Sequence, residues 1–200
     1  MKKKKNDNFL FNFIAPIYGL FYNSQKKNYK ITIDNMHKEL NLKEYENIID
    51  VGCGTGALCS VLNQEGLQVT GIEPAMRMLK IGMKKPGNKE VNFVQCGTCS
   101  KLPFEDKSYD LSIASYVAHG LKPEERKQLF LEMGRLTKHY VIIHDYNNKR
   151  GFFTNIIEWL ERGDYFNFIK VVQSELNEQF KTVKVINVKK QAAWYICEPY

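Results

Sequence analysis

No stretch of this sequence is apolar for long enough to cross a membrane, since a spanning helix needs about 20 consecutive apolar residues. Internal repeats and low-complexity linkers are also missing, which argues against a solenoid or a string of modules. The 200 residues are 44% hydrophobic, which is enough for one globular domain with a sizeable core.

Acidic residues are scarce relative to basic ones. The chain has 22 Asp and Glu against 29 Lys and Arg, giving a net charge of +7, and Lys2–Lys5 form an uninterrupted run. Such a surplus attracts anionic partners such as RNA, acidic lipid or an acidic small molecule. No recognisable nucleic-acid module accompanies it, so we expect a solvated tail and no nucleic-acid partner. A weak contact of the N-terminal aromatic segment with a membrane surface is the alternative.

The N-terminal segment lacks the features of a cleaved signal peptide. Its lysines precede the apolar residues 9–18, but Asn12 and Pro16 interrupt that run and no small-x-small cleavage site follows. We expect an amphipathic helical lid segment over residues 1–45, ahead of the main domain at residues 46–200.

Cysteines are few and odd in number. Five cysteines argue for a reducing compartment, and we expect the cytoplasm. Cys96 and Cys99 form a lone C-x-x-C, but Leu102-Pro103 breaks the helix that a thioredoxin-like motif requires. A metal cluster that also recruited Cys53 and Cys59 would fill the pocket described next. No metal is therefore predicted, and the thiols are expected to pack as small apolar groups.

Three of the glycines stand at alternate positions in one short segment of the chain. The apolar run 47–51 contains Asp50 near its end, and Gly52, Gly54 and Gly56 follow before a helical pattern from about Leu58. This order predicts a strand, a tight turn and a helix N-terminus. Glycine lets the backbone take positive φ and lets a ligand approach bare main chain. The helix start presents N–H groups and a positive dipole end to an anionic group.

Three nucleotide-binding motifs compete for this loop, beside an ordinary turn that binds nothing. A P-loop is excluded because no Gly-Lys-Ser/Thr follows. Gly52-x-Gly54-x-x-Ala57 satisfies the dinucleotide fingerprint in form. Asp50 favours a different ligand, because a carboxylate repels a pyrophosphate and pairs with an ammonium.

The string Asp50-x-Gly52-x-Gly54-x-Gly56 resembles motif I of the class I S-adenosylmethionine (SAM) methyltransferases, in the form common among those that act on small molecules, including the ubiquinone/menaquinone-pathway enzymes. Further similar segments extend the resemblance over residues 47–145. The resemblance implies SAM as cofactor, with Asp50 on its methionyl ammonium. Glu73 ends the next strand and is placed to hold both ribose hydroxyls.

The sequence departs from the family pattern at Thr98 and Cys99, where relatives carry Asp-Ala. The aspartate accepts a hydrogen bond from the adenine amino group in the family, and a threonine hydroxyl is a weaker acceptor. The Ala-Pro-x-Tyr segment that ends at Tyr18 is similar to the one that precedes motif I in relatives. The expected cofactor-binding set is Tyr18, Asp50, Gly52, Cys53, Gly54, Gly56, Glu73, Pro74, Thr98, Cys99 and Ser115.

The acceptor is expected at the carboxyl ends of the fourth and fifth strands, because ligands of doubly wound sheets bind there. His119 is the candidate general base for a hydroxyl or amine nucleophile. Nucleobase amino- and C5-methylation are argued against, because the chain has neither the Asn/Asp-Pro-Pro-Tyr/Phe loop nor a Pro-Cys pair. Other residues that reach this crevice are Ser115, His144, Asp145, Tyr146, and Tyr18 or Tyr22 from the lid.

Strand and helix patterns alternate along the chain, which favours an α/β fold. We expect a single-domain, Rossmann-like, doubly wound, mostly parallel seven-stranded sheet with one antiparallel strand near the C-terminus. Expected strands lie at 47–51, 68–72, 91–95, 108–115, 140–145, 180–188 and 192–197, and later helices at 123–137, 151–162 and 164–179. The predicted function is SAM-dependent methyl transfer to a small-molecule or lipid-like acceptor. Alternatives are a SAM-binding regulator without turnover and a nicotinamide-dependent oxidoreductase, the latter disfavoured because no Tyr-x-x-x-Lys pair lies in a catalytic position.

Overall fold

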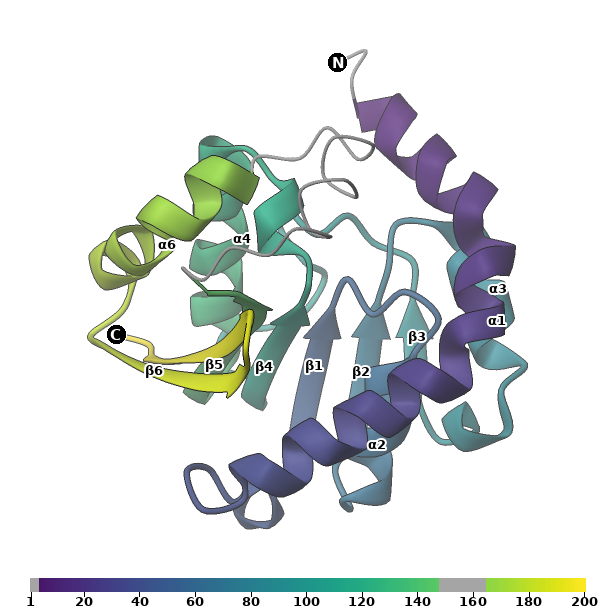
Figure 1. The fold of residues 1–200 in the computed structure, drawn as a ribbon, viewed down its shortest axis with the longest axis horizontal. Coiled ribbons are helices and arrows are strands. Elements are labelled where there is room, and N and C mark those ends of the chain that lie inside the picture. The colour runs from purple at the N-terminus through teal and green to yellow at the C-terminus, as the bar shows by residue number, and fades with distance from the viewer. Residues whose placement is uncertain (1–3, 148–164) are drawn as a thin grey trace. The chain divides into compact units, whose positions relative to one another are not determined.

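The computed structural model describes residues 4–147 and 165–200. The chain forms two compact units, residues 1–98 and 99–200, each described by itself (Figure 1). The strands follow the order β3-β2-β1-β4-β5-β7-β6 in a mixed sheet of seven strands. The expected α/β, Rossmann-like class is therefore confirmed.

The first unit holds three parallel strands and the helices that connect them. Ile49 pairs with Thr70, and Ile72 pairs with Val94, so β1, β2 and β3 run in the same direction. After their first residues, β1 and β2 are buried on both faces, as parallel strands covered by helices must be, whereas β3 is exposed or partly exposed along its length. The elements are α1 (Lys4–Met36), η1 (Leu42–Glu44), β1 (Asn47–Val51), α2 (Ala57–Gln64), β2 (Gln68–Ile72), α3 (Met76–Met83), η2 (Pro86–Asn88) and β3 (Asn92–Val94).

The second unit holds four strands, of which one runs against the others. β4 and β5 are parallel, while β7 is antiparallel to both β5 and β6. A single antiparallel strand near the C-terminus agrees with the sequence prediction. The elements are β4 (Tyr109–Ser115), η3 (Ala118–Gly120), α4 (Pro123–Leu136), β5 (Thr137–Tyr146), α6 (Tyr165–Gln179), β6 (Thr182–Lys189) and β7 (Ala192–Glu198).

The longest helix of the described residues is α1, which lies in the N-terminal segment where a helix was expected. It runs for 33 residues and contains Pro16, which lies in the helix without ending it. Ala15 on α1 packs against Ala75 and Met78 at the start of α3. This contact holds the two helices together within the first unit. In Figure 1 α1 crosses α2 and lies beside α3.

The core of the second unit lies where α4 and α6 pack on the sheet. Leu129, Phe130 and Met133 are the buried side of α4, spaced as one helical face. β5 begins directly at Thr137, three residues earlier than predicted, because no loop separates it from α4. The predicted helix at 151–162 lies outside the described residues.

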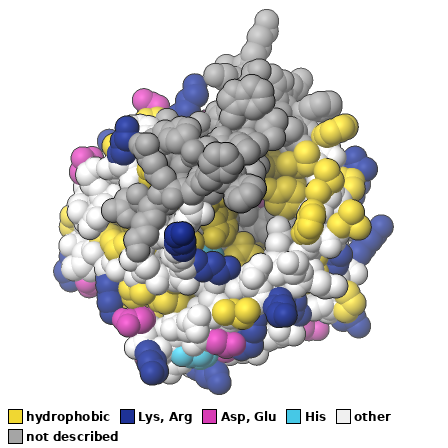
Figure 2. All heavy atoms as spheres, viewed as in Figure 1, with side chains coloured by type: hydrophobic (Ala, Val, Ile, Leu, Met, Phe, Trp, Pro, Cys, Tyr) yellow, Lys and Arg dark blue, Asp and Glu magenta, His cyan; other side chains and the backbone are white. Residues whose placement is uncertain are grey.

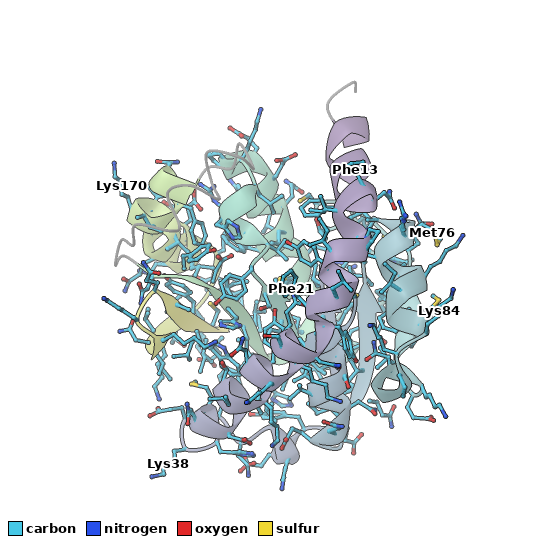
Figure 3. All side chains as sticks on the ribbon, turned by 45° about the vertical axis from the view of Figure 1, so that its right-hand side comes forward. Phe13, Phe21, Lys38, Met76, Lys84 and Lys170 are labelled. Carbon is cyan, nitrogen blue, oxygen red and sulfur yellow. The ribbon has the colours of Figure 1, made fainter. Side chains whose placement is uncertain are left out.

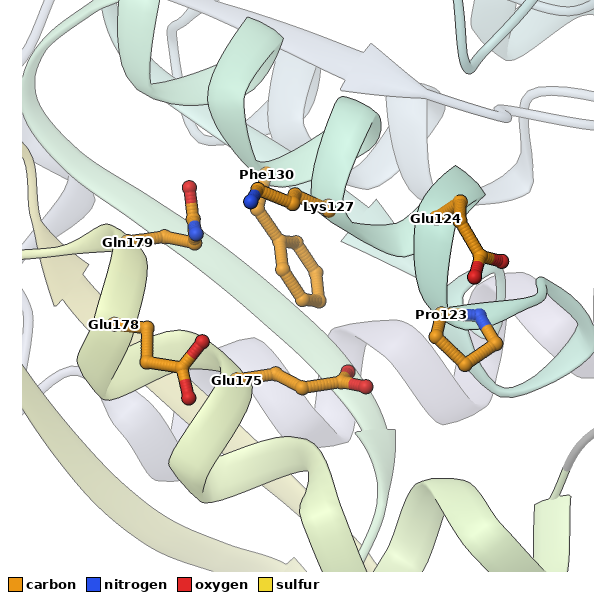
Figure 4. Close-up of a pocket in the computed structure, with 7 residues that line it drawn as sticks. All are labelled: Pro123, Glu124, Lys127, Phe130, Glu175, Glu178 and Gln179. Carbon is orange, nitrogen blue, oxygen red and sulfur yellow. The ribbon is translucent and has the colours of Figure 1, made fainter.

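α4 and α6 also border a pocket (Figure 4). Its lining mixes charged and apolar residues. On one side lies Glu175, whose carboxylate binds the fully buried Arg126 through two hydrogen bonds of 2.7 Å. None of the predicted site residues lines this pocket, which is formed by Pro123, Glu124, Lys127, Phe130, Glu175, Glu178 and Gln179.

Candidate cofactor and acceptor sites

The glycine loop joins β1 to α2 through three residues in the left-handed region. Gly52, Gly54 and Gly56 have φ of 82°, 56° and 72°. A Cβ on Gly56 would lie 2.7 Å from side-chain atoms of Asn88 and Phe93, whereas one on Gly54 would meet nothing within 4 Å. Gly54 is therefore bare backbone facing open space, which is the property that a ligand lying against the loop requires.

Asp50 is a buried carboxylate with an unused oxygen. The residue is 1% exposed, and its Oδ2 accepts a hydrogen bond from the Cys59 thiol at 3.2 Å. Its Oδ1 has no hydrogen-bond partner among the described residues. The pKa of Asp50 is raised to about 7. Burial is the main cause, the nearby charge of Glu73 adds to it, and the hydrogen bond from the Cys59 thiol acts in the opposite direction. Such an orphaned oxygen fits a cationic donor, as the methionyl ammonium of SAM would be.

Glu73 fastens the glycine loop to the turn after β2. Its Oε2 accepts from the Gly54 N–H at 3.0 Å and its Oε1 from the Ala75 N–H at 2.9 Å. Burial raises the pKa of Glu73, and these two backbone donors oppose that shift. Each carboxylate oxygen keeps a second lone pair, so two ribose hydroxyls are still accommodated. Sequence reasoning missed this structural role, because it depends on a contact 19 residues away in the chain. Pro74, next to Glu73, accepts from the Gln95 side chain at 3.1 Å.

The side chains of Cys53 and Cys59 are buried and lie close to Gly71 of β2. A Cβ on Gly71 of β2 would come within 2.9 Å of the Cys53 sulfur and 3.0 Å of the Cys59 sulfur. Burial raises the pKa of both thiols. Both therefore stay protonated at neutral pH, and Cys59 acts as a hydrogen-bond donor to Asp50.

The tyrosines of α1 differ in their surroundings. Tyr18 is partly buried and packs against the cluster of Ala15, Ala75 and Met78, next to the Glu73 turn. Tyr22 is 4% exposed, and its hydroxyl donates to Asn88 Oδ1 at 3.2 Å. Tyr22 is thus a packing residue, and the hypothesis that it reaches into the crevice from a lid is wrong.

Thr98 and Cys99 follow β3 and are partly buried, and the two units divide between them. Ser115 belongs to the second unit and ends β4, where its hydroxyl lies 3.0 Å from His144 Nδ1. The cofactor roles of these three residues stay predictions.

The second unit brings His119 and Asp145 together at the ends of its parallel strands. His119 Nδ1 lies 2.8 Å from Asp145 Oδ1, and the His119 backbone N–H donates to Asp145 Oδ2 at 3.2 Å. Asp145 is fully buried, and the His119 side chain is 12% exposed. A carboxylate on Nδ1 fixes the neutral imidazole in the tautomer whose Nε2 accepts a proton. This is the arrangement that a general base needs.

Aromatic rings surround His119. The ring centroids of Tyr146, Tyr116 and Phe168 lie 4.9, 6.4 and 6.5 Å from that of His119. Burial raises the pKa of Tyr116 to about 12, so its hydroxyl stays protonated at neutral pH. Tyr116 follows β4 with a φ of 54°, a strained conformation typical of functional sites. Sequence reasoning did not single out Tyr116, since positive φ at a tyrosine leaves no local signal.

His144 differs from His119 although both are histidines near strand ends. It is 2% exposed, and burial lowers its pKa to about 4, with a small opposing effect of Asp145. His144 is therefore neutral at physiological pH and serves as a hydrogen-bond partner of Ser115 rather than as a proton carrier.

A family model described as a methyltransferase domain matches residues 49–144, which span both units. An uncharacterized methyltransferase of Staphylococcus carnosus (strain TM300) is 27% identical over 201 residues, covering 90% of this chain and 92% of that protein. A demethylmenaquinone methyltransferase of Staphylococcus aureus (strain JH9) is 33% identical over 86 residues, which are 41% of this chain and 35% of that protein.

A solved structure from Methanococcus maripaludis, of a protein assigned as an S-adenosyl-L-methionine-dependent methyltransferase, has the same fold. Its TM-score is 0.71 at 17% identity, and the alignment covers 94% of this chain and 93% of that one. The domain match, the relatives and the fold agree with the glycine loop and its buried aspartate. The match over residues 49–144 and the relatives support a class I SAM-dependent methyltransferase, and the solved structure shows the same fold.

Proposed function

We propose that this enzyme binds SAM on the first unit and methylates an apolar, ring-bearing small molecule or lipid-like acceptor whose nucleophile is deprotonated by His119. The observation that carries the cofactor assignment is the buried, unpartnered Oδ1 of Asp50 beside the bare backbone of Gly54. SAM supplies a methyl group already activated by its sulfonium. The residues of this chain bind the cofactor, orient the acceptor and remove a proton from it.

The cofactor residues divide the work by charge. Asp50 pairs with the ammonium, and the glycine loop offers N–H donors to the carboxylate at the start of α2. Glu73 receives the ribose hydroxyls through its remaining lone pairs, and Tyr18 packs next to that turn. Thr98 is a further residue of the first unit that we propose for the cofactor, and residues 1–45 act as its lid ahead of the methyltransferase domain. The cofactor roles of Cys99 and Ser115, which belong to the second unit, stay predictions from the sequence.

The acceptor assignment rests on the surroundings of His119. Rings of Tyr116, Tyr146 and Phe168 present apolar faces around one proton-accepting nitrogen. Such faces suit an aromatic or lipid-like molecule with a hydroxyl or amine. The S. aureus relative is named for a quinone precursor, which is a molecule of this class. A water-excluding site also strengthens the Asp145–His119 hydrogen bond.

The predicted cytoplasmic location is retained as part of the proposal. All five cysteines are free thiols, as a reducing compartment requires. Among the helices of the described residues, none combines the length and hydropathy needed to cross a bilayer.

Calorimetric titration with SAM, S-adenosylhomocysteine and NAD tests the cofactor. We expect binding of the first two and none of NAD, and tight NAD binding would overturn the proposal in favour of an oxidoreductase. A methyl-transfer screen with radiolabelled SAM against quinone precursors, phenols and lipid extracts then tests turnover. SAM binding without transfer to any pool would favour a regulator instead.

A further inference from the structure

The N-terminal half of α1 exposes large apolar side chains on its outer face. Phe13, Ile17, Leu20 and Phe21 are 69%, 53%, 83% and 58% exposed. Their spacing places them on one side of the helix, opposite the buried Ala15. Figure 3 shows Phe13 and Phe21 on α1, and Figure 2 shows apolar side chains gathered over this helix with basic side chains at their edge.

This apolar face is confined to the part of α1 that lies beside α3. The Arg77 N–H donates to Asn12 Oδ1 at 2.9 Å and Lys85 Nζ donates to the Gly19 carbonyl at 3.0 Å, which joins the two helices side by side. α3 adds the exposed Met76 and Met83. The next exposed positions along α1 are polar, namely Asn23, Ser24, Lys27 and Asn28, and a single exposed aliphatic residue, Ile31, follows them.

Basic residues outnumber acidic ones on and beside the two helices, although α1 also contains Asp7 and Asp34. Residues 8–33 include three lysines and no Asp or Glu, and residues 75–89 include five basic residues and again no acid. Lys80 and Lys84 are exposed on α3, next to the exposed methionines. Lys2–Lys5 precede this surface in the chain. Apolar side chains beside unopposed cations are complementary to a layer whose interior is apolar and whose surface is anionic.

We propose that the outer face of α1 and α3 docks this protein on anionic lipid bilayers. Phe13, Ile17 and Leu20 enter the headgroup boundary while Lys80 and Lys84 meet lipid phosphates. Nucleic acid fits less well, because it would leave the aliphatic side chains in water. A second copy of the chain would bring two equally basic faces together. The inference does not depend on the proposed methyl transfer.

Vesicle flotation tests the docking with the full-length protein. The probes are vesicles of phosphatidylcholine alone and of phosphatidylcholine with 30% phosphatidylglycerol. We expect at least about tenfold more binding to the anionic vesicles at low salt, and a decrease as salt rises, since each Lys near an anionic surface contributes about 1 kcal/mol. The variants Phe13→Ser/Leu20→Ser and Lys80→Glu/Lys84→Glu should each reduce the fraction bound at least about tenfold.

Matched controls lie on other elements. Leu131 is 48% exposed on α4, and Lys170 is exposed on α6 (Figure 3), so Leu131→Ser and Lys170→Glu should leave vesicle binding unchanged. Thermal melting and SAM calorimetry of every variant report whether it folds. The proposal is overturned if folded wild type ignores anionic vesicles, if the controls lose as much binding as the test variants, or if light scattering shows that the α1 variants abolish a dimer instead. Because methylation is not the readout, failure here leaves the enzymatic proposal standing.

Discussion

At the scale of single residues, Asp50 combines a structural cost with a binding function. Its carboxylate is buried beneath the loop with one oxygen unpartnered among the described residues. A charge in such a place destabilises the fold unless a cation joins it. The cost falls at the position where we propose that SAM brings its ammonium, and strongly shifted pKa values are common at binding sites.

Asp50→Asn should separate stability from binding. The folded-state pKa of about 7 exceeds the unfolded value of 3.8, so Asp50 lowers stability as the pH rises from about 4 through 7. The Asn variant without ligand should be about as stable as wild type at pH 4 and more stable at pH 8, by up to ~4 kcal/mol. Denaturant unfolding at both pH values measures this difference.

SAM affinity should follow the same group in the opposite sense. Wild-type affinity should increase between pH 6 and 8 as Asp50 ionises, while Asp50→Asn should bind at least about tenfold more weakly at pH 8 and show a flat profile. Calorimetry across this range decides the point. An Asn variant with wild-type affinity would remove Asp50 from the site.

His119 and Asp145 make a second residue-scale test. His119→Ala should reduce turnover by about 10²-fold or more and leave SAM affinity intact, because a positioned base contributes at that level. Asp145→Asn should also lose turnover, because an amide no longer stabilises the required imidazole tautomer. His139→Ala, at an exposed histidine of β5 outside the proposed site, is the matched comparison for turnover. His119→Ala with near-normal turnover would show that His119 is not the base.

At the scale of elements, the strand–loop–helix unit of β1 and α2 depends on backbone conformation. Gly54 and Gly66 both have positive φ, 56° and 98°, and a Cβ on either meets nothing within 4 Å. They differ in place: Gly54 is in the cofactor loop and Gly66 follows α2. Comparing the two positions therefore separates the effect of backbone strain on stability from the effect of ligand contact on binding.

Gly54→Ala and Gly66→Ala should each cost about 1 kcal/mol of unfolding free energy, the price of a left-handed non-glycine residue. Only Gly54→Ala should weaken SAM binding, because its methyl group fills the space that the cofactor needs. Unfolding curves and calorimetry on both variants check this. Equal SAM affinity in the two variants would contradict the assignment of the loop.

α4 and α6 are joined by one buried ion pair. Arg126 is fully buried and relies on Glu175, and its guanidinium also lies 5.7 Å from the ring of Phe168. Phe168 in turn neighbours His119. The pair thus holds α6 where the ring of Phe168 lies near His119.

Glu175→Gln should destabilise the protein by about 3 kcal/mol, because it leaves a buried guanidinium without its counter-charge. Glu178→Gln, at an exposed position of the same pocket, should change stability by less than about 0.5 kcal/mol (Figure 4). Urea unfolding of both proteins gives the comparison. Similar losses in the two variants would show that Arg126 does not depend on Glu175.

At the scale of the whole molecule, most of the fold could be predicted from the chain, while the roles of the site residues stay predictions. Alternating strand and helix patterns, together with Asp50 and the glycines, are local signals, and they led to the right fold class and family. Strand ends were less predictable, as at Thr137, because no turn residue separates α4 from β5. The role of Tyr22 was misjudged because a tyrosine on an amphipathic helix carries no mark of the partner that it meets.

The chain by itself determined where a bare loop and an acid stand next to one another, since neighbours in sequence need no folding to meet. Only the tertiary structure decided which distant groups pair: Glu73 with the Gly54 N–H, Asp145 with His119, and the thiol of Cys59 with one oxygen of Asp50 while the other stays unused. Those pairings require strand ends and helix starts to converge, and burial then sets the charge states on which binding and proton transfer depend.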